Sequence, residues 1–224
     1  MSATDKDTKK RRQLPLWQET ILMLVVATAL AVLIKAFFVQ AFYIPSESME
    51  PQFVRLDRIL VQKVSYWNDT PDRGDIVVFK DPGGWLPPQP QSTGVKRALE
   101  LIGLYPTGGH LVKRVIGVGG DRVKCCDNSG RLSVNGQALT EPYLPKGTPP
   151  SSQEFDIKVP AGHIWVMGDN RGNSADSRAH MGLPGGGFID THQVVGKVFA
   201  LVWPLSRAEW ISNPSTFDRV PASP

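Results

Sequence analysis

The chain has 224 residues, a formal net charge of +4 and two cysteines. The first 14 residues hold five basic and two acidic side chains, so they carry +3 of that charge and the rest is nearly neutral. A nucleic-acid partner is therefore not expected, because it would require a basic patch on the folded domain. The histidines at 110, 163, 180 and 192 and the adjacent cysteines lack the spacing of a zinc site, so we expect no metal and no cofactor.

The first predicted element is a transmembrane helix over residues 16–38. Residues 21–34 form an uncharged apolar run, and a span needs roughly 20 residues, so flanking positions must be included. The basic tail at 1–15 favours a cytoplasmic N-terminus and places residues 39–224 outside the membrane, with the lipid bilayer as a partner. A cleavable signal peptide is the alternative, since Ala29-Leu30-Ala31 has the form of a cleavage site. That tripeptide lies inside the apolar run rather than after it, which favours a retained anchor.

A serine-rich turn follows the apolar run, with Ser46 and Ser48 between Pro45 and Pro51. Proline fixes its own φ and pushes the preceding residue toward an extended conformation, so the serines are held in a short, stiff segment. This turn offers a candidate nucleophile close to the membrane surface.

The remaining residues, 39–224, predict one mainly antiparallel β domain. Several apolar segments alternate with period two, and none is separated from the next by a long helix, which favours antiparallel over parallel pairing. Asn135-Gly136 is a strong type I′ hairpin signal. The expected strands are residues 57–64, 75–79, 110–116, 155–159, 163–167 and 194–203.

Two segments are less regular. Residues 81–109 are rich in Pro and Gly and are predicted to be a long insertion loop, in which Val95, Ala98, Leu99 and Ile102 could share one face of a short helix. Cys125 and Cys126 are neighbours, and ordinary disulfides need Cα atoms about 4.4 to 6.8 Å apart, so two free thiols in a buried strand are expected rather than a disulfide.

Lys113 is the best candidate for a general base, because it lies inside the apolar strand 110–116. At an unperturbed pKa only about one lysine in a few thousand is neutral at pH 7. Burial lowers the pKa of lysine and would make a neutral amine available to a serine nucleophile. Without the sequence context, the more common interpretation of Lys113 would be a lysine on an edge strand whose ammonium group lies in water.

Four segments together resemble the type I bacterial signal peptidases, a family of membrane-anchored serine-lysine proteases, and they occur in that family's order. They are residues 45–51, 73–79, 113–121 and 168–178. The resemblance implies an enzyme of the bacterial cytoplasmic membrane that removes signal peptides from exported preproteins after small residues at −1 and −3. It also implies the signal-peptidase type of β fold behind a single anchor.

The resemblance also implies roles for individual residues. Ser48 would be the nucleophile and Lys113 the general base, while the hydroxyl of Ser46 and the backbone N–H of Ser48 would form the oxyanion hole. Ser174 would hydrogen-bond the lysine head. Asp176 and Arg178 would form a supporting ion pair, and Asp169 and Arg171 would hold the loop. The apolar substrate pockets would be shaped by Phe42, Ile44, Met49, Phe53 and Val112. For the four charged loop residues a purely structural role is an equal alternative.

The chain also departs from the family pattern. Gln52 stands where the family often has threonine, and Gly119 replaces a proline. Residues 122–160 are short and hairpin-like, so the second, smaller domain of some members would be reduced, and the 81–109 insertion has no counterpart that we can assign.

Three other functions fit part of the sequence. Self-cleaving repressors use serine and lysine on a related β fold, but they carry a DNA-binding module, and residues 1–40 show no helix-turn-helix signal. Eukaryotic-type signal peptidases have histidine where this chain has Lys113. A single-pass protein that binds exported chains without cleaving them is the non-enzymatic alternative, and the presence of both Ser48 and Lys113 argues against it.

Overall fold

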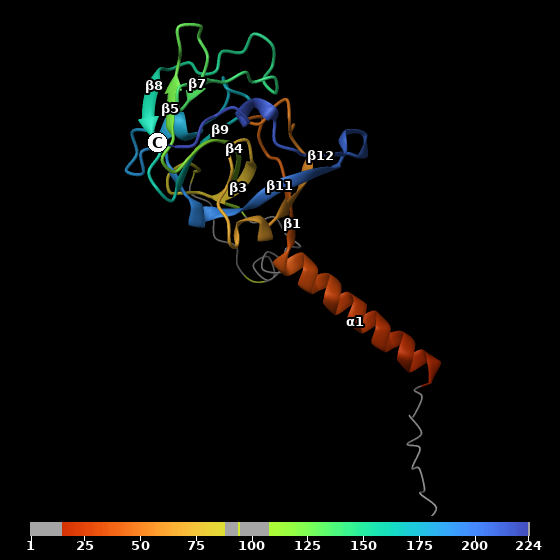
Figure 1. The fold of residues 1–224 in the computed structure, drawn as a ribbon. Helices are drawn as coiled ribbons and strands as arrows, with labels where there is room; N and C mark the ends of the chain where they lie inside the picture. Colours follow the sequence, from red (N-terminus) through yellow and green to blue (C-terminus); the bar gives the residue numbers. More distant parts are fainter. Residues whose placement is uncertain (1–14, 88–93, 95–107, 224) are drawn as a thin grey trace, which may run out of the picture.

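The computed structural model describes residues 15–87, 94 and 108–223. Helix α1 (Leu16–Phe37) projects away from a β domain that the rest of the described chain forms (Figure 1). Large apolar side chains on α1, such as Met23 and Leu24, are exposed. Among the described residues we find no helix long and apolar enough to cross a membrane, so the transmembrane helix expected at 16–38 is not confirmed.

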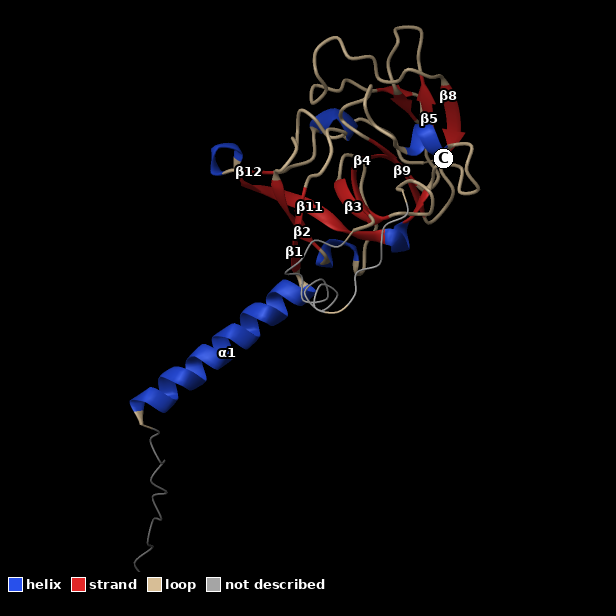
Figure 2. Cartoon of the chain, turned by 180° about the vertical axis from the view of Figure 1, so that it is seen from behind, coloured by secondary structure: helices blue, strands red, loops and turns tan. Residues whose placement is uncertain are grey.

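The larger of two sheets has eight strands, all paired antiparallel (Figure 2). Its order is β1-β2-β11-β3-β4-β9-β10, and β12 pairs with β11. The expected antiparallel β-rich fold is confirmed, and β1, directly after α1, is a strand that the sequence did not predict. The strands are β1 (Val39–Tyr43), β2 (Arg58–Gln62), β3 (Ile76–Lys80), β4 (His110–Val118), β9 (His163–Met167), β10 (Ile189–Asp190), β11 (Val194–Trp203) and β12 (Glu209–Trp210).

The smaller sheet has the order β7-β6-β5-β8 and lies at the end of the domain away from α1 (Figure 1). It comprises β5 (Arg122–Cys125), β6 (Ser133–Val134), β7 (Gln137–Ala138) and β8 (Phe155–Lys158). Asn135 and Gly136 join β6 to β7 with φ of 51° and 80°, as the hairpin prediction requires. Residues 122–160 thus form a four-stranded sheet that contains the expected hairpin.

Short 3₁₀ helices complete the described fold: η1 (Val64–Tyr66), η2 (Ser177–His180), η3 (Thr191–Gln193), η4 (Leu205–Arg207) and η5 (Ser215–Phe217). The side chains of β4 alternate between two faces of the sheet, as the pleat of a strand dictates. Leu111 and Val115 belong to one hydrophobic cluster, whereas Val112 packs against another that contains Ile44 and Met49. Strand β4 therefore separates two apolar layers, and Lys113 lies on the face that also carries Leu111 and Val115.

The two cysteines differ from the sequence-based expectation. Cys125 and Cys126 form a disulfide, so the expectation of two free thiols was wrong. That expectation relied on the Cα–Cα distances of ordinary disulfides, which do not include disulfides between neighbouring cysteines. The possible helical face at Val95, Ala98, Leu99 and Ile102 lies outside the described residues.

Gly196 in β11 provides a test of the sheet. A Cβ there would come within 2.3 Å of the Gln62 carbonyl oxygen of β2. We expect Gly196→Ala to lower the free energy of unfolding by about 1–3 kcal/mol, because the two central strands must separate. Gly182→Ala is the matched control, since nothing lies within 4 Å of its Cβ position. Equal denaturation midpoints for the two variants would contradict the described β2–β11 pairing.

Candidate active site

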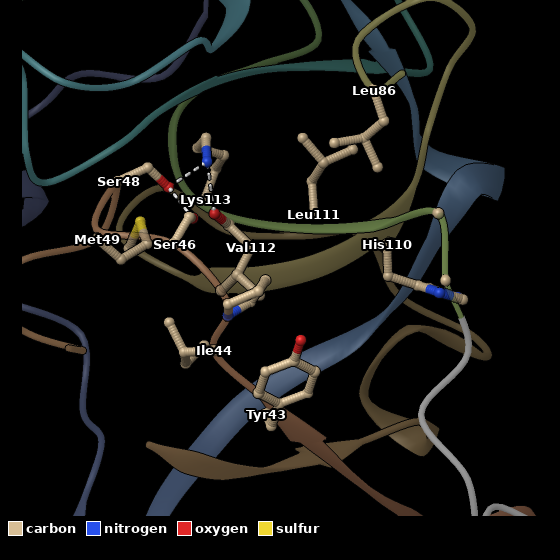
Figure 3. A pocket seen from close by; sticks show the side chains of 13 residues that line it. Tyr43, Ile44, Ser46, Ser48, Met49, Leu86, His110, Leu111, Val112 and Lys113 are labelled. Carbon is tan, nitrogen blue, oxygen red and sulfur yellow. Dashed lines mark hydrogen bonds between the residues drawn. The ribbon is translucent and has the colours of Figure 1, made fainter. Parts of the chain in front are cut away.

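Ser48 and Lys113 meet although 65 residues separate them in the sequence. The Lys113 ammonium nitrogen, Nζ, lies 2.7 Å from Ser48 Oγ and donates a second hydrogen bond of 3.0 Å to the Val112 carbonyl oxygen. Ser48 lies in the turn after β1. Lys113 lies in β4, where its side chain points toward Ser48 (Figure 3). The fold therefore places a hydroxyl beside an amine, which is the arrangement of a nucleophile and its base.

Burial determines the charge state of Lys113. The side chain is 4% exposed, and its desolvation lowers the pKa of the amine to about 8, although Asp176 and Asp169 oppose this shift. A lysine in water has a pKa of about 10.4. A substantial fraction of the amines is therefore neutral at mildly alkaline pH and able to accept a proton from Ser48.

Asp176 and Arg178 form the expected ion pair, with Arg178 Nη2 2.7 Å from the Asp176 carboxylate. The same carboxylate accepts from the backbone N–H of Gly168 at 2.9 Å, and Arg178 Nη2 also donates to the Arg171 carbonyl oxygen at 3.0 Å. Both side chains are buried. These contacts stabilise the loop that follows β9, which lies near Lys113.

The side chains of Asp169 and Arg171 bind different partners, although the backbone N–H of Arg171 donates to the Asp169 carbonyl oxygen at 3.0 Å. Arg114 binds the Asp169 carboxylate through two hydrogen bonds of 2.8 and 2.6 Å, and Arg171 forms an ion pair with Glu141. Arg114 and Glu141 were not singled out in the sequence. Arg114 is a charged residue in an apolar strand, next to Lys113, and this signal could have identified it. No signal in the sequence connects Glu141 to Arg171, 30 residues away.

The remaining expected polar residues lie close by. Ser46 Oγ is 3.3 Å from Ser48 Oγ, on the same turn. Ser174 and Ser48 both lie close to Gly168. A Cβ atom added at Gly168 would be 2.2 Å from Ser174 Oγ and 2.4 Å from the Ser48 carbonyl oxygen, so Ser174 lies near the turn that carries Ser48. The buried Ser174 Oγ has no hydrogen-bond partner in the described part of the chain, so the expected bond to Lys113 is not made.

A cavity of about 290 Å³ opens beside the two residues (Figure 3). Ile44, Met49 and Val112 line it, together with Ser46, Ser48 and Lys113. Phe42 and Phe53 do not line the cavity but pack in the hydrophobic cluster behind Ile44 and Met49. Within the described ranges, no group of three or more His, Cys, Asp or Glu side chains could hold a metal ion.

One side of the cavity is an unfilled strand edge. Residues 110–113 of β4 pair with β3, but on the opposite edge the pairing with β9 starts only at Arg114, opposite Met167. No other described strand pairs with residues 111–113 on that edge. An extended peptide can add as a further strand to an edge that no neighbouring strand occupies.

Comparisons with known proteins show which family the chain resembles. A profile of the family described as "Signal peptidase, peptidase S26" matches residues 17–203. The chain is 40% identical to "Signal peptidase I" of Mycobacterium tuberculosis over 85% of this chain and 74% of the relative, and 32% identical to "Probable signal peptidase I-2" of Synechocystis sp. over 98% and 89%. It is 28% identical to a solved signal peptidase I of Enterococcus faecalis, over 58% of this chain and 97% of that one, with a TM-score of 0.38.

The Arg114–Asp169 pair yields a prediction about stability. Asp169 is fully buried, so Arg114→Met would leave its charge without a partner, which typically costs about 3–5 kcal/mol. We expect a corresponding fall in the urea midpoint of unfolding. The control is Arg122→Met, which breaks an exposed pair with Asp156 and should leave the midpoint nearly unchanged. Similar midpoints for both variants would contradict the structural role given to Arg114.

Proposed function

The chain belongs to the signal peptidase family, peptidase S26, and is a serine endopeptidase of the signal peptidase I type; from this premise we propose that it removes signal peptides by a Ser48–Lys113 mechanism. The observation that carries the proposal is the buried 2.7 Å contact between Lys113 Nζ and Ser48 Oγ at the end of an unfilled strand edge. The non-enzymatic alternative does not account for the contact, and the DNA-binding alternative, which also uses serine and lysine, does not account for the family match.

The proposal includes a membrane anchor. The uncharged run 21–34 and its basic flank at the N-terminus support a single span with a cytoplasmic N-terminus and an extracytoplasmic catalytic domain. The exposed apolar side chains on α1, which the β domain does not cover, are consistent with a lipid environment. An anchor would hold the active site close to the membrane, where a signal peptide emerges.

The first half of the reaction forms an acyl-enzyme. Neutral Lys113 takes the proton of Ser48 as Ser48 Oγ attacks the carbonyl carbon of the scissile bond. The resulting oxyanion accepts hydrogen bonds from the backbone N–H of Ser48 and the hydroxyl of Ser46, and one such donor is typically worth about 2.7–4 kcal/mol. Lys113 then donates its proton to the leaving nitrogen, the C–N bond breaks, and the mature chain departs with a free amine.

The second half is hydrolysis of the ester. Lys113, neutral again, takes a proton from water, and the hydroxide oxygen attacks the ester carbon in the same oxyanion site. Collapse of the intermediate breaks the C–O bond to Ser48, and Lys113 returns the proton to Ser48 Oγ. The signal peptide leaves with a carboxylate, and the enzyme regains its starting protonation state.

Substrate binding follows from the strand edge and the apolar lining of the cavity. An extended peptide pairs with residues 111–113 and directs alternate side chains into the cavity. Ile44, Met49 and Val112 limit the space there, and Phe42 and Phe53 hold the first two in place from behind. Small residues at −1 and −3 fit this arrangement.

We expect Ser48→Ala and Lys113→Ala each to lower kcat at least about a thousandfold, because each removes a reacting group. The assay uses the full chain in detergent and a peptide with Ala at −1 and −3; the same peptide with Phe at −1 should resist cleavage. Lys124→Ala, which alters an exposed lysine of β5, is the matched control. More than a few per cent of wild-type activity in Lys113→Ala would disprove the serine-lysine mechanism.

The rate should also depend on pH. Lys113 accepts a proton only when neutral, so kcat/KM rises as pH increases through the pKa of its amine, giving an acidic limb centred near 8. Rates measured from pH 6 to 11 provide the test. A limb near 6.5 that disappears when one of the four histidines is replaced would identify histidine as the base.

A further inference from the structure

The insertion after β3 begins with an ordered turn. The Asp81 carboxylate accepts hydrogen bonds from the backbone N–H groups of Gly83, Trp85 and Leu86 at 2.9, 3.1 and 3.1 Å. The backbone N–H of Asp81 donates to the Gly109 carbonyl oxygen at 2.9 Å. One side chain thus fixes the path of residues 81–86 immediately beside the start of β4.

Trp85 attaches this turn to the loop that supports Lys113. Its ring stacks on His180 of η2, with centroids 4.1 Å apart and planes at 6°, and meets the edge of Phe79 at 5.8 Å. The 3₁₀ helix η2 also carries Arg178, the partner of Asp176. Trp85 is buried, so the position of the next residue, Leu86, is determined by packing on the catalytic side of the domain.

Leu86 forms part of the cavity wall, on the face opposite to the small-residue pockets. It is half-buried, packs against the cluster that contains Leu111, and lines the same cavity as Ser48 and Lys113. Figure 3 shows Leu86, Leu111 and Lys113 on one side of β4, with Val112 and Ile44 on the other. Two apolar side chains therefore lie close to the free edge of β4 on the face that Val112 does not occupy.

Successive side chains of an extended peptide point to opposite faces. If the residues at −1 and −3 face Ile44 and Val112, the residue at −2 faces Leu86 and Leu111. We propose that Leu86 and Leu111 form a subsite for the −2 side chain, which makes the enzyme favour an apolar residue there. This inference depends on the proposed function, since it assumes that the peptide lies along residues 111–113.

The test compares peptides that have Ala at −1 and −3 and differ only at −2, where they carry Leu, Ser or Lys. For the full chain in detergent we expect kcat/KM to favour Leu over Ser by about three- to tenfold, the size of effect that a partly enclosed apolar pocket gives. Leu86→Ala should bring this ratio close to one, because the Leu peptide loses its contact. Leu86→Glu should make the Lys peptide the best of the three through charge attraction.

The control is Leu183→Ala, since Leu183 lies near Gly84 but does not line the cavity. It should keep the wild-type ratio. A general disturbance of the fold would lower the rates for all three peptides together, whereas loss of a subsite changes their ratio. Equal rates for the Leu and Ser peptides in the wild type, or a ratio unchanged in Leu86→Ala, would overturn the subsite. A wild type that cuts none of the peptides would overturn the proposed function itself.

Discussion

The burial of Lys113 in a paired β strand is the constraint on which the active site depends. An amine in water is almost wholly protonated at neutral pH, and only removal from water makes the neutral form accessible. Two buried carboxylates, those of Asp169 and Asp176, lie close enough to favour the charged amine. Each carboxylate has its own arginine, Arg114 or Arg178, which limits this opposing effect. The ion pairs thus stabilise the loop and preserve the depressed pKa of the lysine.

The same strand explains how a protein substrate could reach the serine. Along β4, pairing with β9 begins at Arg114, so the strand is fully enclosed on one side of Lys113 and open on the other. The enclosed half provides rigidity and desolvation. The open half provides a backbone edge that ends at Lys113, the residue that we propose as the base. In that proposal, substrate binding and catalysis meet at this residue, because the sheet is left incomplete there.

The first residues of the 81–109 segment hold Leu86, for which we propose a role in substrate binding. Its start is fixed by Asp81 and by the stack of Trp85 on His180, so it is coupled to the loop that carries Asp176. In the proposed subsite, the two hydrophobic layers on either face of β4 contact different parts of a bound peptide. Residues 81–86 then adjust substrate preference without altering Ser48, Lys113 or the ion pairs of Asp169 and Asp176.

Local patterns in the sequence determined much of the fold. Period-two alternation located the longer strands, and Asn135-Gly136 located the hairpin, since both signals depend on neighbouring residues alone. Ser48 and Lys113 were identified as candidates through spaced motifs that resemble a family. The sequence did not decide that Arg114 pairs with Asp169 or Arg171 with Glu141, nor that Leu86 reaches the cavity. Such contacts join residues far apart in the chain, and their geometry is determined by the strand order and by the point where β9 meets β4. Only the tertiary structure could decide them, because many long-range pairings are compatible with the same local pattern.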